Sequence, residues 1–184
     1  MNGRHPLGTV ARLWRYPVKG LCPESLACAT IDPEGIVGDR RRVLFVTSTD
    51  HARSGRTYRG KENALLHTRA TVDDARRLAA QRNVDLSARD DGPYFDAEPV
   101  SIVFDSWVRE LEQLIAMPLD PQRFRPNFYV RAAAGFAADE SSLIGRIIAV
   151  GDARLEVVSA IERCVVITND VRTGDATPLV QRAL

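Results

Sequence analysis

The chain has 184 residues and a net charge of +1, from 25 lysines and arginines against 24 aspartates and glutamates. A chain so close to neutrality has no overall field to attract nucleic acid or an anionic membrane, so we expect neither as a partner. Its length fits one domain over residues 1–184, large enough to bury a core without disulfide bonds.

The cysteines predict the compartment. There are three of them (Cys22, Cys28 and Cys164), an odd number without a C-x-x-C pair, which is typical of a reducing environment. The first residues, MNGRHPLGTVARLW, lack the basic and apolar regions of a signal peptide, and no later run approaches 18 apolar residues. We therefore expect a soluble cytoplasmic protein.

The first strand is predicted over residues 9–16, where VARLWRY alternates in polarity. Pro17 ends the pairing because it lacks an N–H donor, and this places Lys19 in an exposed turn at the strand end. A short strand is predicted over residues 26–31, before the turn sequence DPEG.

Three consecutive arginines, Arg40 to Arg42, lead into a compact apolar strand at 43–46. Side chains alternate along a strand, so at least one of the three points away from the others. Two glycines three residues apart, Gly35 and Gly38, predict that the backbone bends tightly just before Arg40.

The middle of the chain combines a loop with two helices. Residues 48–63 are polar and aperiodic, which is typical of a binding loop or of disorder. A helix is predicted over 71–82, capped by Thr71, with arginines on its solvated face. After a polar connection at 87–99 and a strand at 100–104, Asp105 is expected to cap a second helix.

The last third reads mainly as strands. The FYVRA run predicts a strand at 128–132, residues 146–150 and 154–158 predict a hairpin, and 164–168 a last strand. About seven short strands with two helical interruptions indicate a mainly β fold with a few helices (α+β), closed as a barrel to remove its edges.

The stretch from residue 123 to residue 175 inserts polar side chains into otherwise apolar, strand-like sequence: Arg123, Arg125, Asn127, Arg163 and Cys164. Such groups need partners, because an unpaired buried polar group costs about 2 kcal/mol or more. Arginine forks suit phosphate, and a thiolate next to Arg163 suits a soft metal or sulfur transfer. The pattern predicts an anionic, sulfur-rich cofactor, the alternative being that Cys164 is a buried apolar residue.

Five segments together resemble one family: YPVKG (16–20), GIVGDR (35–40), RFRPN (123–127), GDARLEVV (151–158) and ERCVVITNDVRTGD (162–175). Their order and spacing are similar to the MOSC domain, the C-terminal domain of molybdenum cofactor sulfurases. The same domain forms the core of the mitochondrial amidoxime reducing component and its bacterial relatives.

The resemblance implies a MOSC-type β-barrel that binds the molybdenum cofactor, a pterin dithiolene of the molybdopterin type. It implies that Cys164 is the catalytic residue and the protein ligand to molybdenum. It further implies that the cofactor's phosphate and pterin are held by Lys19, Arg40, Arg125, Asn127 and Arg163. Asp170 and Thr173 match the turn after the cysteine and are expected to shape that loop.

Family members usually continue with a further apolar stretch, so the resemblance predicts a barrel shortened at its C-terminal end. The loop at 48–63, or a second copy in a homo-oligomer, would then cover the open edge.

Three functions follow as alternatives. The first is an oxidoreductase that reduces N-hydroxylated or similar substrates with electrons from a separate donor protein, because the chain has no flavin, haem or Fe–S motif of its own. The second is a carrier of cofactor, or of sulfur as a Cys164 persulfide supplied by a cysteine desulfurase. The third is a binding module without catalysis.

Overall fold

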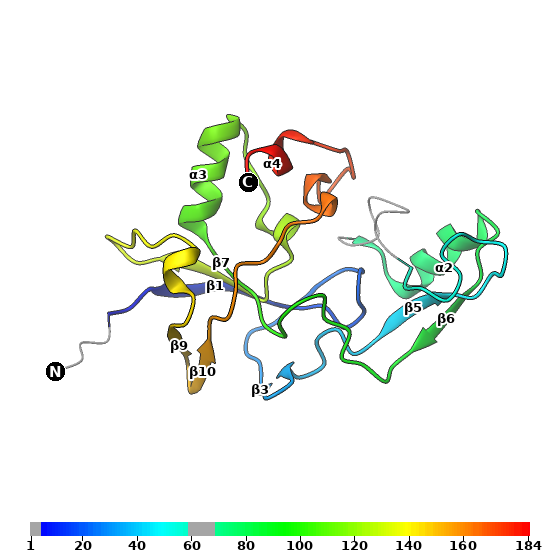
Figure 1. The fold of residues 1–184 in the computed structure, drawn as a ribbon, viewed down its shortest axis with the longest axis horizontal. Coiled ribbons are helices and arrows are strands. Elements are labelled where there is room, and N and C mark those ends of the chain that lie inside the picture. Colours follow the sequence, from blue (N-terminus) through cyan, green and yellow to red (C-terminus); the bar gives the residue numbers. More distant parts are fainter. Residues whose placement is uncertain (1–4, 59–68) are drawn as a thin grey trace.

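The computed structural model describes residues 5–58 and 69–184, which form short strands and a few helices (Figure 1). In chain order, with η for 3-10 helices, the elements are β1 (Gly8–Arg15), β2 (Glu24–Ser25), β3 (Ile31–Asp32), β4 (Gly35–Ile36), β5 (Val43–Val46), α2 (Val72–Ala80), β6 (Leu86–Arg89), β7 (Ile102–Phe104), α3 (Asp105–Ile115), η1 (Pro121–Phe124), β8 (Phe128–Ala132), η2 (Ser141–Leu143), β9 (Ile147–Val150), β10 (Ala153–Glu156), η3 (Val165–Thr168) and α4 (Leu179–Arg182). The prediction of strands mixed with a few helices is confirmed.

The largest sheet has four strands in the order β2-β1-β8-β7. β1 runs antiparallel to β8, with Leu13 opposite Phe128, whereas β7 runs parallel to β8. Three further sheets have two strands each: β3 with β4, β5 with β6, and β9 with β10. Among the described residues these sheets stay separate, and the predicted closed barrel is not found.

The hydrophobic core of the described residues consists of three clusters. At one end of the molecule, α2 packs on β5 and β6 around Leu44, Val46 and Ala79 (Figure 1). A second cluster joins α3 to α4 and η3 through Leu111, Ile167 and other apolar residues. A third lies between the four-stranded sheet and the β9–β10 hairpin. The buried amide of Asn127 lies where β1, β7 and β8 meet.

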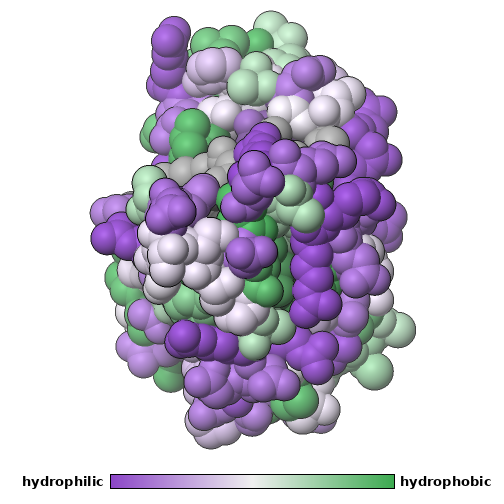
Figure 2. Space-filling view, turned by 90° about the vertical axis from the view of Figure 1, so that its right-hand side faces the viewer, coloured by the Kyte–Doolittle hydropathy of each residue, from purple (hydrophilic) through white to green (hydrophobic). Residues whose placement is uncertain are grey.

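Helix α2 confirms the strongest helix prediction. Thr71 is its N-cap: its hydroxyl accepts a hydrogen bond from the Asp74 N–H, and the Asp74 carboxylate accepts one from the Thr71 N–H. The predicted solvated face is also present, since Arg76, Arg77 and Arg82 are exposed. Figure 2 views this end of the molecule and shows a largely hydrophilic surface.

The start of α3 corrects one prediction. Its N-cap is Phe104, and Asp105 is the first helical residue. The Asp105 carboxylate accepts a hydrogen bond from the Ala132 N–H at 2.8 Å and pairs with Arg109. Asp105 therefore ties the helix to β8 rather than capping it.

Two strand predictions and one predicted connection also need correction. Residues 26–30 are irregular, and only Ile31–Asp32 pair there, with β4. The expected strand at 164–168 is a 3-10 helix, η3, with Cys164 as its N-cap. Residues 86–89, interpreted mostly as a connection, form β6 against β5. In each case the local pattern was short, and long-range pairing decided the outcome.

The predicted loop at 48–63 lies partly outside the described residues. Its described part contains turns and an isolated bridge between Phe45 and Thr57. In the described part of the chain, no helix is long and apolar enough to cross a membrane.

Candidate functional site

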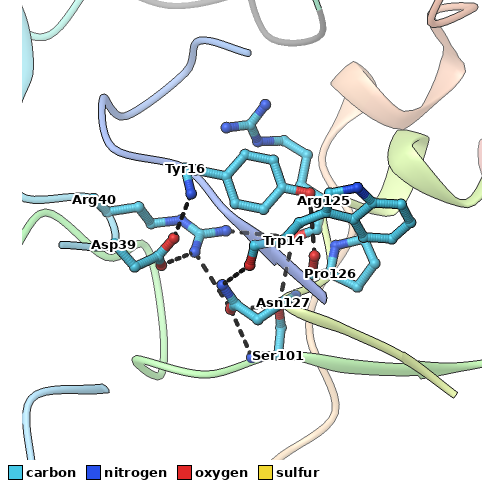
Figure 3. A network of polar contacts seen from close by, with 8 residues as sticks. All are labelled: Trp14, Tyr16, Asp39, Arg40, Ser101, Arg125, Pro126 and Asn127. Carbon is cyan, nitrogen blue, oxygen red and sulfur yellow. Dashed lines mark hydrogen bonds and ion pairs between the residues drawn. The ribbon is translucent and has the colours of Figure 1, made fainter. Parts of the chain in front are cut away.

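The site begins at the end of β1, where the Tyr16 side chain is buried (Figure 3). Its backbone N–H donates to Asp39 Oδ1 at 2.6 Å, and its hydroxyl donates to the Pro126 carbonyl at 3.1 Å. Burial raises the pKa of Tyr16 to about 12. The phenol therefore stays protonated and fixes the end of β1 against the segment before β8.

Asn127 joins the three strands. Its side chain is fully buried, and its Nδ2 donates to the Trp14 carbonyl on β1 at 3.2 Å. Its Oδ1 accepts hydrogen bonds from the backbone N–H and the hydroxyl of Ser101, just before β7, both at 3.1 Å. Most of the amide's hydrogen-bonding capacity is therefore used within the protein, which leaves one Nδ2 hydrogen for other partners.

Two guanidinium groups lie on the Tyr16 ring. The Arg40 Cζ is 4.8 Å from the ring centroid, and the Arg125 Cζ is 4.1 Å from it. Arg40 forms an ion pair with Asp39, and its Nη2 donates to the Arg125 carbonyl at 3.3 Å. The structure thus brings together three of the predicted cofactor-binding residues: Arg40, Arg125 and Asn127.

Burial and neighbouring charges determine the electrostatics of this site. Asp39 is fully buried and is the carboxylate paired with Arg40. Burial lowers the pKa of Arg125 to about 10, and the charge of Arg40 acts in the same direction. Because Arg125 is still protonated at neutral pH, it and Arg40 bring two positive charges close together, which favours an anionic ligand.

Both arginines occupy the left-handed backbone region, with φ of 48° at Arg40 and 50° at Arg125. That conformation is uncommon for residues with a side chain and costs about 1 kcal/mol or more, so it persists only where surrounding contacts enforce it. It occurs here at the two residues whose guanidinium groups lie on the Tyr16 ring.

The indole N–H of Trp14 is a further hydrogen-bond donor near the site, and it was not predicted from the sequence. Its side chain is 4% exposed, and its Nε1 is buried without a hydrogen-bond partner among the described residues. Trp14 on β1 and Tyr16, directly after the strand, are two residues apart, a spacing that puts side chains on one face of a strand. This alternation is the signal that could have identified Trp14.

Lys19, also predicted to bind the cofactor, pairs with an acidic residue instead of joining the two arginines. Its Nζ pairs with the exposed carboxylate of Asp96 at 2.6 Å, and no described contact joins it to Arg40 or Arg125. Lys19 follows β1, as predicted, in a segment held by the hydrogen bond from its N–H to the Arg42 carbonyl.

Arg163 and Cys164 lie on the approach to η3. Arg163 Nη1 donates to the Phe124 carbonyl at 3.3 Å, and its Cζ is 5.4 Å from the Phe124 ring centroid. Burial lowers the pKa of Arg163, an effect opposed by Glu140 and Cys164. Cys164 itself is exposed, so its interpretation as a buried apolar residue is wrong.

Arg123 fixes η3. It is buried, and its guanidinium donates to the Thr168 carbonyl at 2.8 Å and to the Asp170 carboxylate at 2.9 Å. Asp170 accepts hydrogen bonds from the N–H groups of Arg172 and Thr173, which lower its pKa. Asp170 therefore shapes the loop, as predicted.

Cys22 is a cysteine that interacts electrostatically with Arg125. It is half-buried, and burial raises the pKa of its thiol, whereas Arg125 acts to lower it. No group of three or more His, Cys, Asp or Glu residues among the described ones is arranged to hold a metal ion.

Comparison with known proteins gives one match. A family model described as MOSC domain matches residues 89–183, a range that contains Ser101, Arg125, Asn127, Arg163 and Cys164. Trp14, Lys19 and Arg40 lie outside it. No curated protein and no solved structure matches the chain.

Proposed function

Because the chain belongs to the MOSC domain family, we propose that it binds the molybdenum cofactor and reduces N-hydroxylated or similar substrates. The observation that carries the proposal is the site on Tyr16, where the guanidinium groups of Arg40 and Arg125 lie on one aromatic ring. When bound, the cofactor would supply two-electron redox chemistry at a metal, with electrons from a separate donor protein.

The residues present fit such a group. Arg40 and Arg125 would hold its phosphate by charge-assisted hydrogen bonds, and the buried Nε1 of Trp14 offers one more donor. Ser101 and Asn127 keep β1, β7 and β8 together beneath these donors. Cys164 is exposed and therefore accessible as a thiolate ligand.

The test is the cofactor content of the protein. Made in a host that synthesises the cofactor, it is expected to contain molybdenum and pterin, measured by elemental analysis and by fluorescence of the oxidised pterin. Protein from a host deficient in the cofactor is the control. Loaded protein with a reducing system should reduce an N-hydroxylated base. Absence of molybdenum from both preparations would contradict the proposal.

Replacing Trp14 with phenylalanine tests the unpartnered indole N–H. We expect the Trp14→Phe protein to release the cofactor about tenfold or more faster, as a lost hydrogen bond to a charged group is worth about 1.5–3 kcal/mol. Without cofactor, the smaller ring should cost some stability in urea through the cavity it leaves, but no internal hydrogen bond is lost.

Trp107→Phe is the matched control, since the Trp107 Nε1 donates to the Ala138 carbonyl at 2.9 Å. That substitution should lower stability in urea and leave cofactor release unchanged. Equal release rates for the two variants would show that Trp14 does not bind the cofactor.

A second function, the transfer of sulfur, is favoured by the exposure of the Cys164 thiol. In this function, the Cys164 thiolate would take the outer sulfur from a cysteine desulfurase persulfide, forming its own persulfide and releasing the desulfurase thiolate. The sulfur would then pass to an acceptor.

A further inference from the structure

A separate cavity of about 310 Å³ opens beside the site. Its walls come from the segment before β7, the start of α3, the β9–β10 hairpin and residues 157–163, which connect that hairpin to η3. In Figure 1 this connection rises from β10 toward η3. The volume lies at the lower end of the range for small-molecule sites.

The cavity adjoins the site at two points. Ser101 lines it and also hydrogen-bonds the buried Asn127 amide. Arg163 lines it and precedes Cys164 in the chain. The guanidinium of Arg163 is already engaged, because it donates to the Phe124 carbonyl and lies against the Phe124 ring.

Aromatic and aliphatic side chains make up most of the wall. Phe104 and Trp107 both line the cavity, and their ring centroids are 4.8 Å apart at an angle of 62°. Phe136 stacks on Phe104 from behind, with centroids 4.4 Å apart. The hydrogen bond from Trp107 Nε1 to the Ala138 carbonyl fixes the indole orientation. A fixed indole face is the best aromatic surface for an organic cation.

The charged residues of the wall are mainly acidic. Four carboxylates contribute to it against two guanidinium groups: Asp32, Glu98, Glu140 and Glu156 against Arg154 and Arg163. Within the described part of the chain, none of these four carboxylates forms an ion pair. An anionic cofactor would be repelled here, whereas a positively charged ligand would be attracted.

We propose that this cavity binds an organic cation with an apolar body, such as an aryl-alkyl ammonium or amidinium, and that it is the substrate pocket. The apolar body packs against Phe104 and Trp107, and the charge lies near Glu98 and Glu140. Its assignment as the substrate pocket rests on the proposed function; the binding of the cation does not.

The test uses cofactor-free protein and the fluorescence of Trp107. The chain has two tryptophans, so the Trp14→Phe background leaves Trp107 as the reporter. The probes are benzyltrimethylammonium, benzyl alcohol and phenylacetate. We expect saturable quenching by the cation, with affinity about tenfold above that of the alcohol, corresponding to about 1.4 kcal/mol, and weaker binding still for the anion. Calorimetry on the wild-type protein repeats the series without a substitution.

Carboxylate variants test the charge recognition. The double variant Glu98→Gln with Glu140→Gln should weaken cation binding about tenfold and leave binding of benzyl alcohol unchanged. Glu110→Gln, on the exposed face of α3 and away from the cavity wall, is the matched control and should bind the cation like the parent.

The outcomes separate the two proposals. Equal affinity for the three probes, or preference for phenylacetate, would overturn the cation pocket even in a protein that carries molybdenum. Selective cation binding by a protein that never acquires molybdenum would support the pocket and contradict only the proposed redox function.

Discussion

Cys164→Ala is expected to lose molybdenum while the protein remains folded. The thiol is exposed, so its removal should change the free energy of unfolding by about 0.5 kcal/mol or less. If the sulfur is a metal ligand, however, its loss removes the covalent link to the metal, and turnover of N-hydroxylated substrates should fall to background. Molybdenum content, pterin content and urea denaturation of the same preparations would show these effects separately.

Two other cysteines serve as comparisons. Cys28 is also exposed, so Cys28→Ala should match the wild type in both stability and molybdenum content. Cys22 is half-buried and interacts electrostatically with Arg125. Loss of molybdenum from Cys22→Ala with retention in Cys164→Ala would assign the ligand to Cys22 instead.

A substitution at Cys164 also distinguishes the oxidoreductase function from the sulfur-carrier function. Wild-type protein incubated with a cysteine desulfurase and labelled cysteine should acquire labelled sulfur if the chain is a carrier. Cys164→Ser should then remain unlabelled. Labelling of this variant to the wild-type level would exclude Cys164 as the sulfur acceptor.

The parts of this fold that could be predicted are those governed by local chemistry. The capping box at Thr71 and the tight turn at Gly151 are encoded within a few residues, and α2 and the β9–β10 hairpin formed as expected. Strand β8 was predicted as well, because FYVRA alternates and contains β-formers.

Failures arose where partners distant in sequence decide the structure. Residues 165–168 are all β-branched, yet they form η3, where the buried guanidinium of Arg123 binds the Ile167 and Thr168 carbonyls. Asp105 was expected to act on its own helix, but its carboxylate accepts the Ala132 N–H. A single sequence does not reveal such pairings.

The candidate site was predicted only in part. Arg40, Arg125 and Asn127 are brought together as the family resemblance implied, although 85 or more residues separate Arg40 from the other two. The role of Asp39 was not predicted. A lone aspartate between a glycine and an arginine gives no sign that it will be fully buried beneath two positive charges.

Asp39→Asn is expected to be the most destabilising of the substitutions considered. The carboxylate is fully buried, accepts the Tyr16 N–H and pairs with Arg40, whose side chain is only 15% exposed. Removing one partner of a buried ion pair leaves the other uncompensated and costs about 3–5 kcal/mol. The new amide would also direct an N–H donor at a guanidinium. Urea denaturation of cofactor-free protein would measure the loss.

The matched control is Glu34→Gln, which breaks an exposed pair with Arg41 at 2.7 Å and should cost about 1 kcal/mol or less. Equal losses for the two variants would show that the Asp39 pair is no more important than a surface pair.

Asp39→Asn also tests whether the site binds anions. Without the Asp39 carboxylate, Arg40 loses its ion-pair partner beside the Arg125 guanidinium, so phosphate should restore part of the stability of Asp39→Asn and have less effect on the wild type. Chloride at equal ionic strength controls for general screening. Stabilisation of both proteins to the same extent would mean that phosphate binds elsewhere. A selective effect would instead place the anion at Arg40 and Arg125, where the cofactor phosphate is proposed to lie, and would do so without requiring the cofactor itself.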